Sequence, residues 1–385
     1  MNQEIRDKFI ALFGAEPQMF RAPGRVNLSG EHTDYNEGFV LPAAVDKMIA
    51  FAVKPNSVGR FRFFAFDLNE SFETEADNIG VSQTAWANYL LGVVAQFRKA
   101  GLTVPSFDCV FGGNVPLGAG MSSSAAIEVG MAFAINSMFG LGVNRLTMTK
   151  FAQMAEHEYA GVNCGIMDQF ASMHGKAGHV VRLDCRSLDF EYFPLDMTNY
   201  RLVLVNTGVK HSLASSEYNK RRAECEEGVR ILQKYYNGVR SLRDATAEMI
   251  EAHRSEFGDV VYRRCSYIVE ENERLLAGCK ALADGDFAAF GQLMFGSHEG
   301  LSHKYEVSCA ELDQLVAIAR TVPGVLGSRM MGGGFGGCTI TLVEKTKVAD
   351  FERAIKLGYK TPDGREPVIY EVVIADGAGE LKVEN

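Results

Sequence analysis

The eight cysteines of this chain are scattered, and no two of them form a C-x-x-C pair. That spacing favours reduced thiols in a cytosolic protein over a disulfide framework or a zinc site. The chain also lacks a run of about eighteen apolar residues, so we expect no membrane span. Arg6, Asp7 and Lys8 stand where a signal peptide would carry its apolar segment, and we therefore expect a soluble, cytoplasmic protein.

An excess of positive charge is missing as well, because the formal net charge is −9. This balance argues against nucleic acid or an acidic membrane surface as the main partner. An anionic ligand would therefore be held locally, by backbone amides, by one or two arginines or by a metal ion. The 385 residues suggest two domains, and the 47% apolar content is that of an ordinary globular protein.

Repeats, low-complexity stretches and Pro/Ser-rich linkers are absent too, so a domain boundary has to come from pattern alone. We place it near residue 195, giving domains 1–195 and 196–385. The pattern predicts an α+β protein with mixed sheets rather than a regular βαβ alternation. The predicted strands are 61–66, 107–111, 179–183, 202–205, 339–343 and 368–374, and the predicted helices are 123–139, 149–158, 215–236, 241–255, 258–281, 284–296, 308–320 and 348–357.

Polar side chains are concentrated between Gly24 and Asn36, where one cation, two carboxylates, an imidazole and two carboxamides occur together. Arg, Glu and Asp are rarely fully buried without a partner. The glycines at 24 and 30 allow tight turns, so these groups could converge on one small hydroxylated ligand. A surface loop with a local salt bridge is the alternative, and this segment alone does not decide between them.

A second segment, 114–126, follows a strand and opens a helix with three consecutive serines. The first amides of a helix have no internal partner, which makes such an end a site for anions. Serine hydroxyls can add donors or bind Mg²⁺. No lysine follows the glycines, so this is not a Walker A loop. The alternative is an ordinary serine N-cap after a glycine turn.

The third segment, 156–170, has glycines at 161 and 165 that allow two tight turns. Asp168 is then expected in the first turn of the next helix, where the helix dipole favours an acid and where it could orient a substrate hydroxyl. Glu156 lies at the end of the preceding helix, where an acid opposes the dipole. This suggests a cation partner such as Mg²⁺.

The fourth segment, 330–338, has five glycines in six positions ahead of a strand. Glycine loses much conformational entropy on folding, so such a run needs a reason. Either the backbone approaches a ligand or a second loop there, or the run is a flexible hinge.

Together the four segments resemble the motifs of the GHMP small-molecule kinases, and among them those of the galactokinase family. The stretch 24–36 is similar to the sugar-binding motif, 116–126 to the nucleotide-phosphate loop and 332–337 to the third family motif. The resemblance runs from Arg21 to about Leu342. It implies an N-terminal mixed-sheet domain like domain 2 of ribosomal protein S5, a C-terminal ferredoxin-like α/β-plait domain, and an active site between them.

The resemblance also implies residue roles. Arg25 would stabilise the transferring phosphoryl group, and Asp168 would lie at the sugar hydroxyl. Residues that would line the sugar pocket are Glu31, His32, Thr33, Asp34, Gly165 and Tyr218. Residues that would bind ATP are Gly118, Ala119, Gly120, Met121, Ser122, Ser123 and Ser124, with Ser124 and Glu156 on Mg²⁺. Trp86 resembles a residue near the adenine, and a core aromatic is its alternative reading.

The implied activity is ATP-dependent phosphorylation of the anomeric hydroxyl of D-galactose to galactose 1-phosphate, the first step of galactose catabolism, by a monomer. Phosphorylation of N-acetylgalactosamine or arabinose is one rival. A non-catalytic sugar sensor is another, but such sensors are shortened in the serine loop, which is complete here. Ser29 and Met331 depart from the family pattern, and we expect them to tune activity rather than abolish it. His298 and His303 are not expected to bind a metal.

Overall fold

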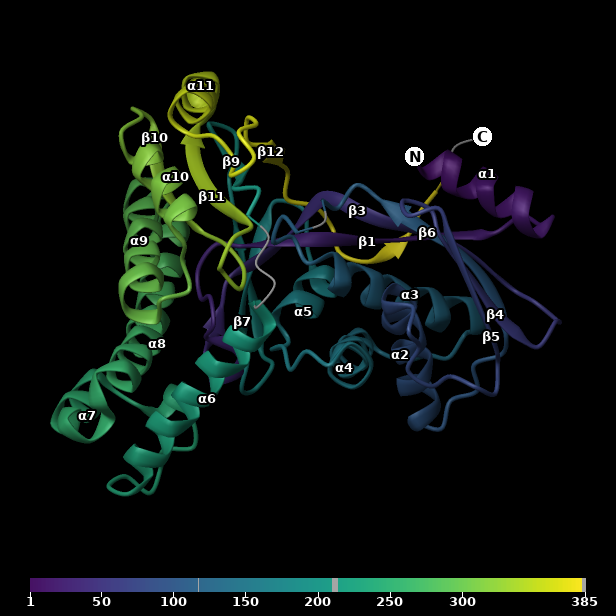
Figure 1. The fold of residues 1–385 in the computed structure, drawn as a ribbon, viewed down its shortest axis with the longest axis horizontal. Helices are drawn as coiled ribbons and strands as arrows, with labels where there is room; N and C mark the ends of the chain where they lie inside the picture. Colours follow the sequence, from purple (N-terminus) through teal and green to yellow (C-terminus); the bar gives the residue numbers. More distant parts are fainter. Residues whose placement is uncertain (117, 210–213, 383–385) are drawn as a thin grey trace.

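The N-terminal half is built on a six-stranded mixed sheet (Figure 1). The computed structural model describes residues 1–116, 118–209 and 214–382. In spatial order the strands of this sheet are β13 (Gly379–Glu380), β1 (Gln18–Asn27), β3 (Pro42–Pro55), β6 (Phe107–Gly113), β4 (Arg60–Ala65) and β5 (Glu70–Glu75). Neighbouring strands are antiparallel except β4 and β6, which are parallel.

Helices cover both faces of this sheet. Successive side chains of a strand point to opposite faces, and in β3 both sets are apolar and need burial. In β3, Phe51 and Val53 pack into the main core, whereas Ala50 and Ala52 pack against Phe9 of the N-terminal helix. That helix is α1 (Asn2–Phe13). The layer on the other face is formed by α2 (Ala85–Lys99), α3 (Ser123–Phe139), α4 (Arg145–Ala155) and α5 (Met167–His174).

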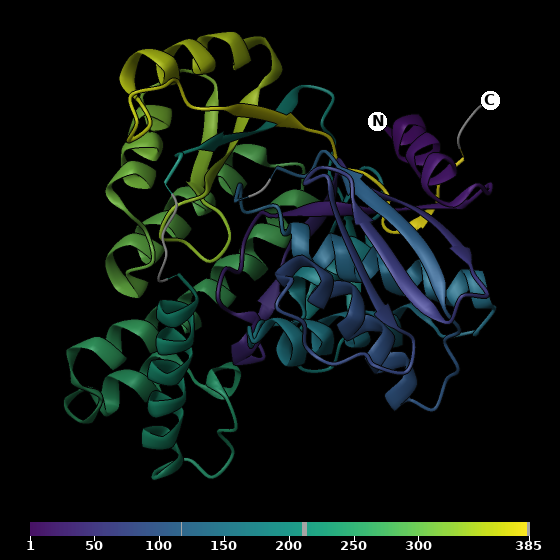
Figure 2. The same ribbon diagram turned by 45° about the vertical axis from the view of Figure 1, so that its right-hand side comes forward.

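The C-terminal half has a four-stranded antiparallel sheet with its own helices, and Figure 2 shows this green-to-yellow half beside the purple-to-blue one. Its strands in spatial order are β10 (Val325–Met330), β11 (Cys338–Glu344), β9 (Tyr200–Asn206) and β12 (Ile369–Val372). Its helices are α6 (Ala214–Gln233), α7 (Ala247–Ala252), α8 (Arg254–Ala283), α9 (Phe287–Glu299), α10 (Ala310–Arg320) and α11 (Val348–Gly358). A small third sheet contains β2 (Phe39–Val40), β7 (His179–Asp184) and β8 (Phe190–Pro194).

One hydrophobic cluster runs through both halves. It joins Phe20 and Phe51 of the first sheet to Leu204 and Ile340 of the second, and to Leu275 of α8. The chain also returns to its start, because β13 pairs with β1 (Figure 1). The predicted boundary near residue 195 stays a prediction, and residues that follow it contribute a strand to the N-terminal sheet.

The α+β organisation agrees with the sequence prediction, but the prediction lacked the strands β1, β3 and β10, and several helix boundaries differ. The predicted helix 149–158 ends as α4 at Ala155 and continues as a π turn, Glu156–Ala160. The predicted helix 241–255 is two short pieces, a 3-10 turn and α7, because Ser241 and Thr246 each cap a separate start. No helix of the described residues is long and apolar enough to cross a membrane.

Candidate active site

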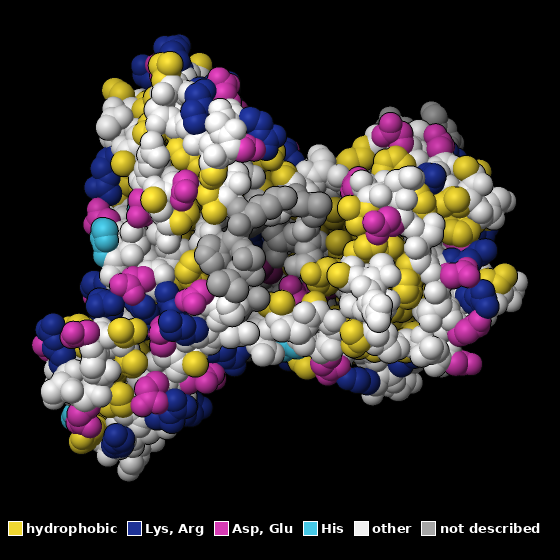
Figure 3. Space-filling view, viewed as in Figure 1, with side chains coloured by type: hydrophobic (Ala, Val, Ile, Leu, Met, Phe, Trp, Pro, Cys, Tyr) yellow, Lys and Arg dark blue, Asp and Glu magenta, His cyan; other side chains and the backbone are white. Residues whose placement is uncertain are grey.

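Two cavities meet at Ser124, which lines both of them, and Figure 3 shows the surface hollowed between the two halves of the molecule. The first cavity, ≈170 Å³, is lined by Arg25, Glu31, His32, Asp34, Ser122, Ser124, Glu156, Val162, Cys164, Gly165, Met167, Asp168, Tyr218, Gly332 and Gly333. The second, ≈420 Å³, is mostly apolar and is lined by Ile49, Ala65, Asp67, Leu68, Trp86, Tyr89, Phe111, Gly113, Val115, Ser123, Ser124 and Ile127. The first contains residues of both halves.

A β-bulge in β1 places Arg25 at the first cavity. The pairing of β1 with β3 changes register between Pro23 and Arg25, and bulges of this kind redirect side chains next to active sites. The guanidinium forms a two-point ion pair with Asp168, with Nε–Oδ1 and Nη2–Oδ2 distances of 2.8 Å. Its Nη1 also donates to the carbonyl of Gly120 in the serine loop. Arg25 and Asp168, which are 143 positions apart in the chain, are therefore in contact.

The serine loop holds Ser122 in an unusual conformation. Ser122 is the N-cap of α3, with φ 56° and ψ 63°, and its side chain does not cap the helix. Residues other than glycine rarely adopt these angles, and such strain is found at functional sites. Its hydroxyl donates to Oδ2 of Asp168 instead. The first amides of α3 are thus left without a side-chain cap, as an anion site requires.

Oxygen ligands suited to a divalent cation lie beside this loop. Ser124 Oγ donates to Oε1 of Glu156 at 3.1 Å, and Gln169 Nε2 donates to Oε2 of Glu156 at 2.6 Å. Burial and then the nearby charge of Asp168 raise the pKa of Glu156, so a cation here would favour its ionised form. Among the described residues no three His, Cys, Asp or Glu side chains are placed to hold a metal. Mg²⁺ bound by Ser124 and Glu156 would therefore need further oxygens, such as those of substrate phosphates.

Glu31 is tied to the C-terminal half by a buried ion pair. Arg329 of β10 is fully buried, and its Nη2 donates to Oε1 of Glu31 at 2.8 Å. The same guanidinium donates to the carbonyls of Asn27 and Leu28. The amide of Gly332 also donates to Oε1 of Glu31, at 2.9 Å. These bonds join the sugar-binding motif to the glycine run.

His32 is held in its neutral form. Burial lowers its pKa to about 3. Its Nε2 lies 3.2 Å from the carbonyl oxygen of Gly333, and its Nδ1 lies 2.9 Å from the hydroxyl of Tyr35. A neutral ring satisfies both contacts when Nε2–H donates to Gly333 and Nδ1 accepts from Tyr35. The ring of Tyr218, from α6, has its centroid 5.3 Å away.

Asp34 lies against Gly165, where no side chain fits. A Cβ on Gly165 would lie 1.8 Å from Oδ2 of Asp34. Burial, and next the charge of Asp168, raise the pKa of Asp34 to about 7. The carboxylate is thus poised to change charge near neutral pH.

Three of the candidate residues do not present side chains to either cavity. Thr33 is fully buried, and its hydroxyl donates to the carbonyls of Gly30 and Phe39, so it shapes the loop. Ala119 and Met121 are buried in the core, which leaves only their backbone to meet a ligand. Within the predicted phosphate loop, 116–126, residue 117 lies outside the described residues.

Trp86 fits both readings of the sequence. Its ring packs 5.6 Å from that of Phe111, and it also lines the second cavity. Its indole Nε1 donates to Glu70. The Nε2 atom of His298 lies 3.2 Å from Oδ1 of Asp313.

Ser29 and Met331, the two departures from the family pattern, both contact residues that are distant in the sequence. Ser29 Oγ donates to Glu271 of α8 at 3.2 Å. Glu271 is fully buried and also accepts from the amide of Gly30 at 2.9 Å. Met331 is buried, and its carbonyl lies where a Cβ on Gly120 would approach to 3.3 Å. The glycine run therefore packs its backbone against the serine loop.

The sequence prediction missed Arg329 and Glu271. Arg329 pairs with Glu31 of the sugar-binding motif, and Glu271 accepts from the amide of Gly30 in the same motif. An arginine inside a strand-like segment just before the glycine run was a usable signal for Arg329. Glu271 stands in the run Glu270-Glu271-Asn272-Glu273-Arg274, which has the composition of a solvated helix face, so it gave no signal.

Models of known protein families match most of this architecture. "Galactokinase galactose-binding signature" matches residues 7–55, "GHMP kinases N terminal domain" residues 88–176, and "GHMP kinases C terminal" residues 279–361. A galactokinase of Roseiflexus sp. (strain RS-1) is 41% identical over 379 residues, which cover 98% of this chain and 97% of the relative. The chain belongs to the galactokinase family.

Further relatives and solved structures agree with the galactokinase family. A galactokinase of Thermotoga maritima is 41% identical over 94% of this chain and 99% of its own. The crystal structure of Lactococcus lactis galactokinase complexed with galactose has a TM-score of 0.94 at 33% identity, covering 98% of this chain and 99% of that one. Methanococcus jannaschii mevalonate kinase, 18% identical with a TM-score of 0.67 over 94% of this chain and 99% of its own, shares the fold.

Membership of the galactokinase family confirms the predicted two-domain GHMP kinase fold and the predicted enzyme class. The chain is a sugar kinase, and ATP is its co-substrate.

Proposed function

We propose that this chain transfers the terminal phosphoryl group of ATP to the anomeric hydroxyl of D-galactose, which yields galactose 1-phosphate and ADP. The observation that carries the proposal is the Arg25–Asp168 ion pair, which lies where the sugar motif and the serine loop share one cavity. Phosphoryl transfer asks the protein mainly for alignment and charge stabilisation, and this pair is placed to supply both.

The sugar is held by Glu31, His32, Asp34, Gly165 and Tyr218, which line the first cavity from both halves. Neutral His32 and the carboxylates of Glu31 and Asp34 provide directed hydrogen-bond partners for sugar hydroxyls. A site with buried polar groups of this kind rejects sugars whose hydroxyls cannot pair with them. Thr33, which we expected at the sugar, acts by holding the loop that carries its neighbours.

The nucleotide lies across the second cavity and the serine loop. Trp86 and the apolar lining of that cavity receive the adenine, and the amides of Gly118, Ala119, Gly120, Met121, Ser122, Ser123 and Ser124 receive the phosphates. Ser124 and Glu156 would hold Mg²⁺, which would supply positive charge against the negative charge of the nucleotide phosphates. Ser124 lines both cavities and so marks where nucleotide and sugar meet.

The reaction forms a bond between the anomeric oxygen and the γ-phosphorus and breaks the bond from that phosphorus to the bridging oxygen of ADP. Asp168 orients the anomeric hydroxyl and accepts its proton late in transfer, and the proton then passes to solvent. Arg25, fixed by Asp168 and by the Gly120 carbonyl, stabilises charge on the moving group.

Asp168→Asn tests this assignment. We expect kcat for galactose phosphorylation to fall by roughly a hundredfold to ten-thousandfold, because the proton acceptor is lost. Galactose affinity, measured by calorimetry, should stay close to that of the wild type. Asp189→Asn, at an exposed position without an ion pair in the described chain, is the matched control and should leave kcat unchanged.

The substrate is tested by a steady-state comparison of galactose, glucose, N-acetylgalactosamine and arabinose with ATP. We expect the highest kcat/KM for galactose. Turnover of Asp168→Asn near the wild-type value would refute the role of Asp168. A preference for another of these sugars would refute the substrate.

A further inference from the structure

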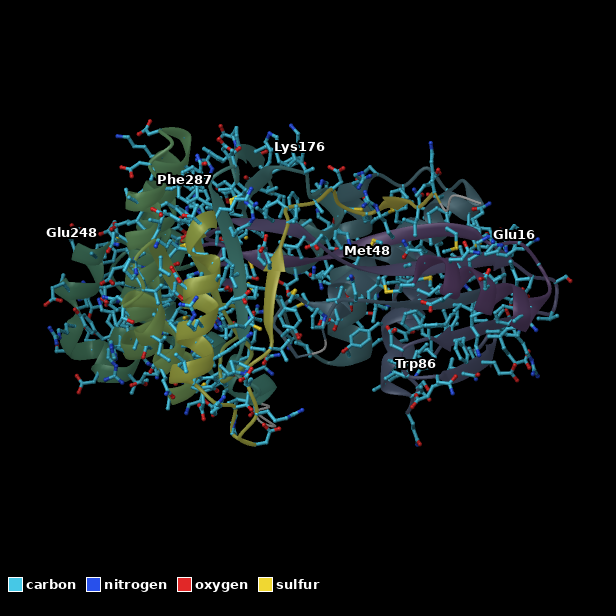
Figure 4. The ribbon with its side chains drawn as sticks, turned by 90° about the horizontal axis from the view of Figure 1, so that it is seen from above. Glu16, Met48, Trp86, Lys176, Glu248 and Phe287 are labelled. Atoms are coloured by element: carbon cyan, nitrogen blue, oxygen red, sulfur yellow. The ribbon has the colours of Figure 1, made fainter. Side chains whose placement is uncertain are left out.

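A third cavity, ≈400 Å³, lies where the C-terminal segment rejoins the N-terminal sheet. The side chains that line it and matter here are Arg21, Arg145, His174, Lys176, Tyr192 and Asp376. None of them lines either cavity of the active site. In Figure 4, Lys176 and Trp86, which marks the second cavity, lie on opposite sides of the molecule.

The cations of this cavity lack carboxylate partners. Nearly every arginine forms an ion pair, and those without one among the described residues are Arg21, Arg98 and Arg145. Two of these three line the same cavity. Lys176 is unpaired within the described chain as well, and its Nζ lies over the ring of Tyr192 at 5.3 Å from the centroid. Unpaired cations gathered at one hollow of a protein of net charge −9 need an explanation.

Arg145 is held rigidly without being neutralised. Its Nη1 donates to the carbonyl of Met173 at 2.6 Å, and its Nη2 donates to the carbonyl of Ala378 at 3.0 Å. Burial lowers the pKa of Arg145, which means that its charged form lacks compensation. Asp376 is the single acid of the lining, and its Oδ1 accepts from the amide of Ala177 at 2.9 Å. The three cations and one carboxylate leave the cavity with an excess of two positive charges.

We propose that this cavity binds a small dianion of the phosphate-monoester class. Guanidinium groups suit phosphate because their planar fork of donors matches phosphate oxygens, and the lysine adds a compact charge. A dianion balances the excess charge, whereas a monoanion leaves half of it. This site is separate from the catalytic one, and the proposal does not depend on which sugar the kinase phosphorylates.

The cavity shares two elements with the Arg25–Asp168 pair. β1 carries Arg21 at the third cavity and Arg25 at the active site, and α5 carries Asp168 in its first turn and His174 at its end. Ser172 of α5 donates to the carbonyl of Pro23 in β1 at 2.7 Å, which ties the two elements together. An anion in the cavity therefore lies against the same strand and helix that position the reacting groups.

The test is a calorimetric titration of the full-length protein with inorganic phosphate at about pH 8, where the dianion predominates. The protein is first saturated with galactose and a non-hydrolysable ATP analogue, so that phosphate does not report on the serine loop. The variants are Arg21→Gln and Lys176→Gln, whose side chains form no hydrogen bond in the described chain. Lys280→Gln, an exposed lysine of α8 without an ion pair, is the matched control.

We expect phosphate to bind the wild type and Lys280→Gln equally, and Arg21→Gln to bind at least about tenfold more weakly, because a charge-assisted hydrogen bond is lost. Lys176→Gln should weaken binding in the same direction. Equal affinity in Arg21→Gln and Lys280→Gln would overturn the proposal. Tighter binding of succinate than of phosphate would overturn the ligand class. Both results compare variants outside the catalytic machinery, so they stand apart from any failure of the proposed galactose phosphorylation.

Discussion

Asp34 and His32 are two positions apart in the sugar-binding motif, and burial drives both toward their neutral forms. For His32 this lowers the pKa to about 3, so the ring stays neutral across the physiological range and keeps its contacts with Tyr35 and Gly333. For Asp34 burial raises the pKa to about 7, so its charge changes close to working pH. The same physical cause fixes one side chain and makes the other sensitive to pH.

Galactose affinity should therefore depend on pH. A sugar hydroxyl that donates to Asp34 requires the carboxylate, so binding releases a proton wherever Asp34 is protonated in the free protein. As pH falls below about 7, we expect the Kd for galactose to rise by up to about tenfold per pH unit. Calorimetry across this range measures the effect, and Asp34→Asn should bind weakly but without the slope. A Kd that stays constant through pH 7 in the wild type would contradict the role of Asp34.

At the scale of elements, helix α8 supports the sugar-binding motif from the C-terminal half. Its residue Glu271 accepts from the Gly30 amide and from the hydroxyls of Ser29 and Ser297. It also pairs with Arg274 one turn later on the same helix. A fully buried carboxylate with this many partners fixes where the loop of the motif can lie.

Glu271→Gln should lower the free energy of unfolding by roughly 3 kcal/mol, because it removes a fully buried carboxylate together with its ion pair to Arg274. The KM for galactose should rise in the same variant as the motif loosens. Glu270→Gln, on the same helix but 35% exposed, should lose less than about 1 kcal/mol. Urea unfolding measures both variants, and equal losses would show that Glu271 has no special part in holding the motif.

At the scale of the whole molecule, the two halves share one core, and the C-terminal half contributes a strand to the N-terminal sheet. Leu204 and Ile340 belong to the same cluster as Phe51, and β13 adds to the sheet of the N-terminal half. The buried Glu31–Arg329 pair also crosses between the halves. Separating the halves would expose apolar surface and leave this pair's charges unmatched.

A fragment of residues 1–195 should therefore fail to fold by itself, although its sequence contains most of the reacting groups. We expect it to show neither a cooperative thermal transition nor dispersed amide signals by NMR, whereas the full chain unfolds in one main transition. A fragment that unfolds cooperatively would mean that the N-terminal half is an independent folding unit.

Local pattern determined the α+β class, most helices and the four segments of the family, but it missed the strands β1, β3 and β10. It determined the helices and the segments because hydrophobic periodicity, glycines and caps act over a few residues, as in α3, where the prediction 123–139 and the structure agree. The break between the 3-10 turn and α7 also has a local cause, the two N-caps Ser241 and Thr246. The predicted helix 241–255 ran through both of them. The contact of Arg25 with Asp168 was expected from the resemblance to the family rather than from either segment.

Only the tertiary structure decided which polar groups reach the cavity and in which charge state. Thr33 stands in the same motif as His32 and Asp34, yet its hydroxyl turns to backbone carbonyls. Arg329, nearly 300 residues beyond Glu31, became part of the site because burial requires each charge to meet its opposite. Contacts of this kind depend on desolvation and on distant segments coming together, and neither can be predicted from the residues that are adjacent in the sequence.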